Sequence, residues 1–147
     1  MKTQTLETQR SMTPSTALQY LKAGNQRFVN NLKASRNLLK QVNETREGQW
    51  PFAVILSCID SRAPSEVLFN LGLGDVFNCR LAGNVQNADI LGSMEFTTKL
   101  AGAKVILVMG HSACGAVAGA IAEAKLGNLT QLLAKILGAN ETQESSL

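Results

Sequence analysis

The sequence predicts an α/β fold in which a central, mainly parallel sheet is flanked by helices. Three short strand patterns, at 52–57, 76–80 and 105–109, alternate with segments of helical pattern, which is typical of parallel strands joined by crossover helices. The first pattern is apolar up to its final Ser57 and the third is apolar throughout, and this predicts strands buried on both faces. With 147 residues, the chain is expected to form a single domain spanning 1–147.

A helical extension precedes the first strand. Thr13 followed by Pro14 is typical of a helix start, with an N-cap and a proline at the first helical position. Apolar side chains then recur at helical spacing, namely Leu18, Leu21, Phe28 and Leu32. A shorter amphipathic segment around 38–42 ends before Gly48. Residues 1–12 and 139–147 are expected to be flexible ends.

Further helices are predicted between and after the strands. Residues 64–71 form a short helical pattern that two glycines end, and 87–100 form a longer one. After the third strand, the small residues of 116–124 predict a helix that packs closely on the sheet. A last helix is expected at 129–137.

Potential metal ligands follow two of the predicted strands. Cys58 and Asp60 come directly after the first strand, and His111 and Cys114 follow the third. Either pair alone is a weak signal, because most histidines are structural and most buried cysteines behave as small hydrophobes. Adjacent parallel strands would bring both pairs to one edge of the sheet. The pattern then predicts a tetrahedral zinc site at Cys58, His111 and Cys114, with Asp60 close enough to be a fourth ligand.

The two motifs that carry these residues, CIDSR at 58–62 and GHSACGAV at 110–117, resemble the paired signature of the β-class carbonic anhydrases. The likeness covers roughly residues 17 to 136 and includes GNQRF, GLGDVF, RLAGN and LGSMEF. It implies a Zn²⁺ held by two cysteines and one histidine beside an Asp-Arg pair. Family members generally continue through a further helix and strand, so this chain is expected to be truncated or unusually short.

The resemblance implies the reversible hydration of carbon dioxide to bicarbonate and a proton, with hydroxide supplied at zinc as the nucleophile. Arg62 would hold Asp60 off the metal, and Asp60 would orient the hydroxide. For an isolated D-S-R motif a structural ion pair would be the preferred reading, but the adjacent zinc motif favours a catalytic one. Two alternatives stay open: a related hydrolase of carbonyl sulfide or carbon disulfide, and a fragment that binds zinc without catalysis.

Substrate contacts are also implied by the resemblance. They are Gln49, Phe77, Phe96 and Gly115. Gln49 matches a glutamine that reaches the neighbouring subunit's site, and the N-terminal helices of the family lie across the partner subunit. A homodimer or homotetramer is therefore expected.

Two positions bear on regulation. Some family members hold a regulatory bicarbonate with a tryptophan and a tyrosine, where this chain has Ile55 and Phe96. Arg80 is the remaining group that could attract an anion. We therefore expect Asp60 to stay paired with Arg62 near neutral pH, with no inhibition by bicarbonate at a second site.

Composition excludes several other classes of function. The net charge of +3 comes from scattered lysines and arginines, which predicts no binding of nucleic acid or of a membrane surface. No apolar segment approaches the roughly 20 residues of a membrane span, and the first twelve residues do not resemble a signal peptide. The three cysteines, of which Cys79 is expected to be packing, suit a reducing compartment. A cytoplasmic location is expected.

Overall fold

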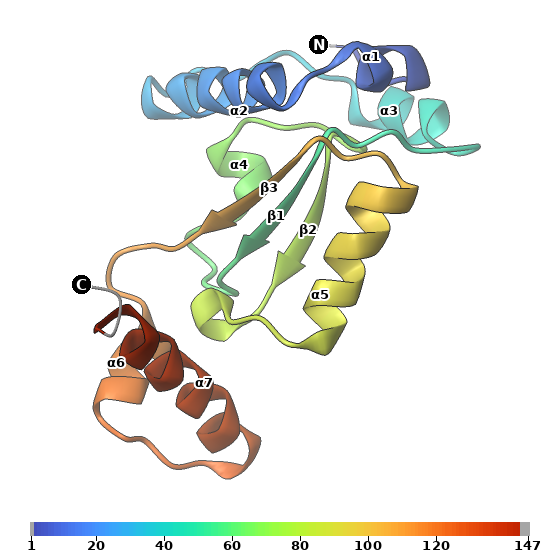
Figure 1. The fold of residues 1–147 in the computed structure, drawn as a ribbon. Helices are drawn as coiled ribbons and strands as arrows, with labels where there is room; N and C mark the ends of the chain where they lie inside the picture. Colours follow the sequence, from blue (N-terminus) through green and yellow to red (C-terminus); the bar gives the residue numbers. More distant parts are fainter. Residues whose placement is uncertain (1, 145–147) are drawn as a thin grey trace.

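The computed structural model describes residues 2–144, with the side chains of 140–144 excepted. Its sheet has three parallel strands in the order β2-β1-β3 (Figure 1). These are β1 (Ala53–Ser57), β2 (Val76–Arg80) and β3 (Val105–Met109). Ser57 is in register with Arg80 on one side and Met109 on the other, so the three strands end level. The predicted fold class is confirmed.

The central strand β1 is buried along its whole length because helices cover both of its faces. On one face Ala53 and Ile55 belong to a core cluster with Ala17 and Leu21 of helix α2 (Pro14–Val29). On the other face Val54 and Leu56 pack with Met94 of helix α5 (Ala88–Glu95). Successive side chains of β1 thus point to opposite faces of the sheet, as expected of a strand. Helix α5 continues into one wide turn, η2 (Phe96–Leu100).

The edge strand β3 differs from the prediction of complete burial. Ile106 and Val108 are 46% and 59% exposed, on the face opposite to the cluster that contains Val105 and Leu107. Helix α6 (Gly115–Ile121) and helix α7 (Gly127–Glu144) lie beyond the carboxyl ends of the strands and do not cover this face (Figure 1). The prediction of a helix packed on the sheet at 116–124 was therefore wrong in its placement, and α7 extends past the expected end at residue 137.

Helix α2 buries only part of the predicted apolar stripe. Thr13 caps the helix and Pro14 begins it, as predicted. However, Leu18 and Phe28 are 38% and 42% exposed, whereas the buried residues are Ala17, Leu21 and Gly24. A side chain at Gly24 would collide with the backbone carbonyl of Phe69, so close packing against helix α4 (Ser65–Leu68) selects the small-residue face.

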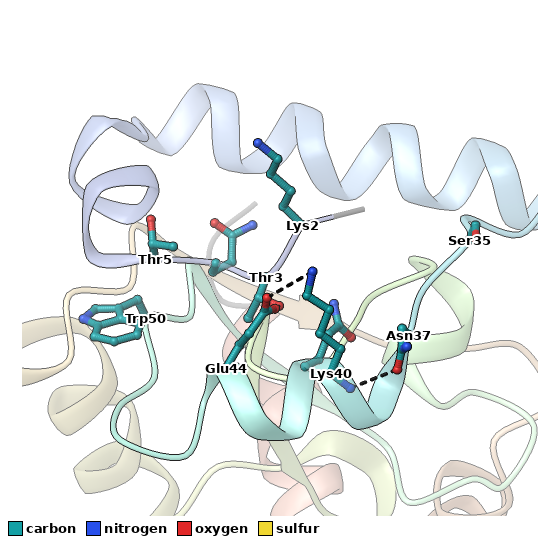
Figure 2. A pocket seen from close by; sticks show the side chains of 10 residues that line it. Lys2, Thr3, Thr5, Ser35, Asn37, Lys40, Glu44 and Trp50 are labelled. Atoms are coloured by element: carbon teal, nitrogen blue, oxygen red, sulfur yellow. Dashed lines mark hydrogen bonds and ion pairs between the residues drawn. The ribbon is translucent and has the colours of Figure 1, made fainter.

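The N-terminal segment is fastened to the amino ends of the strands. Helix α1 (Leu6–Ser11) forms within the end that was expected to be flexible, with Thr5 as its cap. The side-chain amide of Gln9 donates to the carbonyls of Pro51 (2.7 Å) and Ala101 (2.8 Å). Thr3 donates to the carboxylate of Glu44 on helix α3 (Leu38–Glu44), beside a cavity of about 570 Å³ that Trp50 also lines (Figure 2).

The N-terminal segment does not occupy the opposite end of the sheet, where the carboxyl ends of the strands lie. The short turn η1 (Ala82–Asn84) follows β2 there, and the loops after β1 and β3 meet at the same end. Within the described residues, none of the helices combines the length and the hydropathy that a membrane-crossing segment requires.

Candidate metal centre

The loops that follow β1 and β3 bring two cysteines and a histidine together. Cys58 directly follows Ser57, the last residue of β1, whose register partner Met109 is the last residue of β3. The ligand atoms of Cys58, His111 and Cys114 all lie within 4.8 Å of one another. Among residues 2–139, this is the group of His, Cys, Asp and Glu side chains that could hold a metal ion. The structure thus assembles the trio expected from the sequence.

The spacing of these donors fits zinc. The sulfur atoms of Cys58 and Cys114 are 3.9 Å apart. Two thiolates bound tetrahedrally to one zinc at 2.3 Å each would be separated by about 3.8 Å. The Nδ1 atom of His111 lies 2.9 Å from the carbonyl oxygen of Ser112, to which it can only donate, so Nε2 carries the lone pair. That Nε2 is buried and has no hydrogen-bond partner, as expected of a metal ligand.

The surroundings of Cys58 favour its thiolate, the form that binds a metal ion. Burial raises the pKa of its thiol, but the backbone N–H groups of Gly83 and Asp60 donate to its sulfur and favour the thiolate more strongly. The pKa is lowered to about 7. Because zinc binds the thiolate, less free energy is needed to deprotonate this ligand at neutral pH.

Asp60 is beside the trio but is held by Arg62. Its Oδ1 accepts from the backbone N–H (2.9 Å) and Nε (3.0 Å) of Arg62, and its Oδ2 accepts from Nη2 (2.7 Å). The Arg62 hydrogen bonds hold the pKa of the Asp60 carboxyl well below its usual range. Oδ2 also lies 3.8 Å from Nε2 of His111. A carboxylate that is ionised at neutral pH, and so can only accept hydrogen bonds, therefore lies beside the donor trio.

A glycine that sequence reasoning did not single out completes the surroundings of Cys58. The backbone N–H of Gly83 donates to the Cys58 sulfur at 3.3 Å. Gly83 has φ +68°, and a Cβ there would lie 2.5 Å from Cδ1 of Ile136. In the sequence, the one feature that could have indicated this role of Gly83 is its position in the RLAGN segment, at a turn after a predicted strand.

Comparison with known proteins agrees with this geometry. A family model described as carbonic anhydrase matches residues 53–147, which include both loops of the site. Carbonic anhydrase 2 of Mycobacterium tuberculosis is 40% identical over 119 residues, which are 79% of this chain and 56% of that protein. The chain belongs to the carbonic anhydrase family. The carbonic anhydrase of Mycolicibacterium smegmatis is 42% identical over 106 residues, 71% of this chain and 51% of its own length.

Solved structures place the chain in the β class of that family. A Coccomyxa β-carbonic anhydrase in complex with acetazolamide matches with a TM-score of 0.64 and 25% identity, covering 71% of this chain and 50% of that one. The β-carbonic anhydrase CafA of Aspergillus fumigatus matches with a TM-score of 0.64 and 27% identity, covering 90% and 62%. The chain spans about half the length of the curated relatives it matches.

Three of the four expected carbonic anhydrase substrate contacts lie away from the trio within one chain. Gln49 is exposed and precedes β1, whereas Cys58 follows it, and a five-residue strand spans about 16 Å. Phe77 and Phe96 meet edge to face, with ring centroids 6.5 Å apart, and line a cavity of about 650 Å³ between β2 and α5. Phe77 is in register with Val54, about 10 Å before the carboxyl end of the sheet. Gly115 adjoins Cys114 as the first residue of α6.

Proposed function

We propose that this chain binds one Zn²⁺ through Cys58, His111 and Cys114 and catalyses the reversible hydration of carbon dioxide to bicarbonate and a proton. The observation that carries the proposal is the buried Nε2 of His111, which has no partner and lies among two thiols beside a carboxylate held by arginine. Membership of the carbonic anhydrase family supports it. Zinc in a site of this kind supplies hydroxide from water near neutral pH.

The chain's own residues would orient the nucleophile. Asp60 stays ionised because Arg62 occupies both of its oxygens, and an ionised carboxylate can only accept hydrogen bonds. Its Oδ2 would accept a hydrogen bond from the O–H of the hydroxide and so direct the oxygen lone pair toward carbon dioxide. The fork from Arg62 would keep Asp60 from becoming a fourth metal ligand.

We further propose that the site is completed by a second copy of the chain, in a homodimer or larger homo-oligomer. Gln49, Phe77 and Phe96 would then contact carbon dioxide and bicarbonate in the partner's site, since they lie away from the trio of their own chain. Gly115 would contact substrate in its own chain. A cytoplasmic location without nucleic-acid partners remains a prediction.

The test combines metal analysis with stopped-flow hydration of carbon dioxide on one preparation. The wild-type chain should contain about one zinc and accelerate hydration. Asp60→Asn should keep the zinc but lower the rate by about 100-fold or more, the usual cost of losing one preorganised hydrogen-bonding group in an active site. A wild-type protein that holds zinc without accelerating hydration would favour the non-catalytic zinc-binding alternative.

A further inference from the structure

Arg80, the last residue of β2, contacts the loop that carries Cys58 and Asp60. Its Nε donates to the carbonyl oxygen of Cys58 at 2.9 Å, and its Nη2 donates to the carbonyl oxygen of Asp60 at 2.7 Å. The register that places Arg80 opposite Ser57 aims the side chain at these two carbonyls, because the loop leaves the sheet at that point. One guanidinium thus bridges two peptide groups two residues apart.

Few other hydrogen bonds reach the two backbone carbonyls of this part of the loop. The side chain between the two carbonyls, Ile59, is 59% exposed, so hydrophobic packing does not fix the backbone there. The Asp60 carbonyl also accepts from the backbone N–H of Ala63 at 3.1 Å, which closes the following turn but does not involve the Cys58 carbonyl. The planar fork of Arg80 fixes both peptide groups at once.

The same short segment also holds the other end of Cys58. Gly83, three residues after Arg80, donates its backbone N–H to the Cys58 sulfur. The carbonyl and the sulfur of this one residue are therefore both held from the segment 80–83. A small rotation of the Cys58 backbone would move its sulfur relative to that of Cys114.

We propose that Arg80 is a positioning residue of the metal centre, whose two hydrogen bonds to the Cys58 and Asp60 carbonyls keep the Cys58 sulfur and the Asp60 carboxylate in place. The inference rests on the zinc site of the proposed function and assigns Arg80 a geometric task within it. It also argues against Arg80 serving mainly as an anion site, because Nε and Nη2 already donate to the main chain.

The substitution Arg80→Lys separates geometry from charge. Lysine keeps the positive charge but lacks the fork and cannot hold both carbonyls in the same way. Zinc affinity of the metal-free protein, measured by competition with a chromogenic chelator, should fall about 10- to 100-fold, as for other groups that orient metal ligands. The visible absorption bands of the cobalt(II)-substituted variant should shift as well, because the ligand geometry changes.

Arg46→Lys is the matched control, since Arg46 is exposed and donates to its neighbour Glu47. It should leave zinc affinity and the cobalt spectrum unchanged. Equal zinc affinity of Arg80→Lys and wild type would overturn the inference. Zinc binding by the wild type without hydration of carbon dioxide would instead overturn the proposed function, and the weaker binding of Arg80→Lys would still support the role of Arg80.

A measurement on the wild type guards against a variant that does not fold. The Nε–H proton of Arg80 should exchange with solvent more slowly than that of Arg46, because its hydrogen bond to the Cys58 carbonyl is partly buried, whereas the hydrogen bond from Arg46 to Glu47 is exposed. NMR of the arginine side chains reports both rates in the same sample. Equal exchange at Arg80 and Arg46 would overturn the inference without any substitution.

Discussion

The sulfur atoms of Cys58 and Cys114 lie 3.9 Å apart, although 56 residues separate them in the chain. The relationship is produced by the register of β1 against β3, since each cysteine lies in the loop that leaves its strand at the carboxyl end. A shift of register by one residue would displace the two sulfurs relative to each other by about 3.3 Å along the strand direction. The metal centre therefore depends on the packing of the sheet core.

The first prediction concerns zinc content. Cys114→Ser should reduce zinc from about one per chain to near zero after gel filtration, because a serine hydroxyl does not ionise at neutral pH and two ligands remain. Affinity should fall by at least about 100-fold, more than for a group outside the ligand set. Cys79→Ser is the control and should retain zinc, since Cys79 lies on β2 and outside the trio. One zinc per chain in Cys114→Ser would show that the ligand assignment is wrong.

The second prediction concerns pH and Arg62. The pKa of Asp60 is lowered in the folded protein, so its pairing stabilises the fold fully above the unfolded pKa of about 4 and is lost only as pH falls further. Asp60 therefore does not titrate between pH 6 and 9. Wild-type hydration should decline gradually toward low pH as hydroxide becomes scarce, without a steep cooperative loss and without inhibition by bicarbonate at a second site.

Arg62→Ala should change this behaviour by freeing Asp60. The released carboxylate would take the fourth position on zinc, and hydration should fall by about 100-fold or more while zinc is retained. X-ray absorption at the zinc edge should then show an additional oxygen ligand. The interpretation would be refuted by a wild-type crystal structure at pH 8 in which an Asp60 oxygen lies within about 2.2 Å of zinc.

The sequence was sufficient to predict the strands and the meeting of the donor pairs. Strand β1 is an unbroken apolar run because it is buried on both faces, and ligands at the ends of parallel strands converge whatever the helices do. The same reasoning failed for β3, whose equally apolar run is exposed at Ile106 and Val108. Apolar periodicity reports what a segment can bury, whereas the placement of α6 and α7 decides what is covered.

The supporting contacts of the site could not be predicted for a different reason. Arg80 donates to two backbone carbonyls, and Gly83 donates its own backbone N–H. Every residue has these backbone groups except for the N–H of proline, so the pattern of side chains in the sequence does not indicate either contact. By contrast, the predicted strand at 52–57 already lies between Gln49 and Cys58 in the sequence, and β1 separates these residues in the structure.

The third prediction concerns Gly83. An alanine there would adopt φ +68° and place its Cβ 2.5 Å from Cδ1 of Ile136, so Gly83→Ala should lower the free energy of unfolding by about 1–3 kcal/mol. Adding Ile136→Val removes the nearest atom and should restore part of the loss. Gly92→Ala is the control, because nothing lies within 4 Å of a Cβ there and alanine favours the helix by up to about 1 kcal/mol. Chemical denaturation measures all three, and equal stability of Gly83→Ala and wild type would contradict the packing described here.

The last prediction tests whether a partner chain completes the site. Gln49→Ala removes a proposed substrate contact but keeps the metal trio, and Cys114→Ser removes the metal but keeps Gln49. Each homo-oligomer should hydrate carbon dioxide poorly. If Gln49 acts across the interface, a mixed dimer contains one complete site, formed by the trio of one chain and the Gln49 of the other. Random exchange of subunits makes half of the dimers mixed, so the mixture should recover about a quarter of wild-type activity.

Gln49→Ala mixed with itself is the control for the exchange procedure. Activity of the mixture no greater than the mean of the two separate variants, with subunit exchange verified by native mass spectrometry, would show that Gln49 does not serve the partner's site.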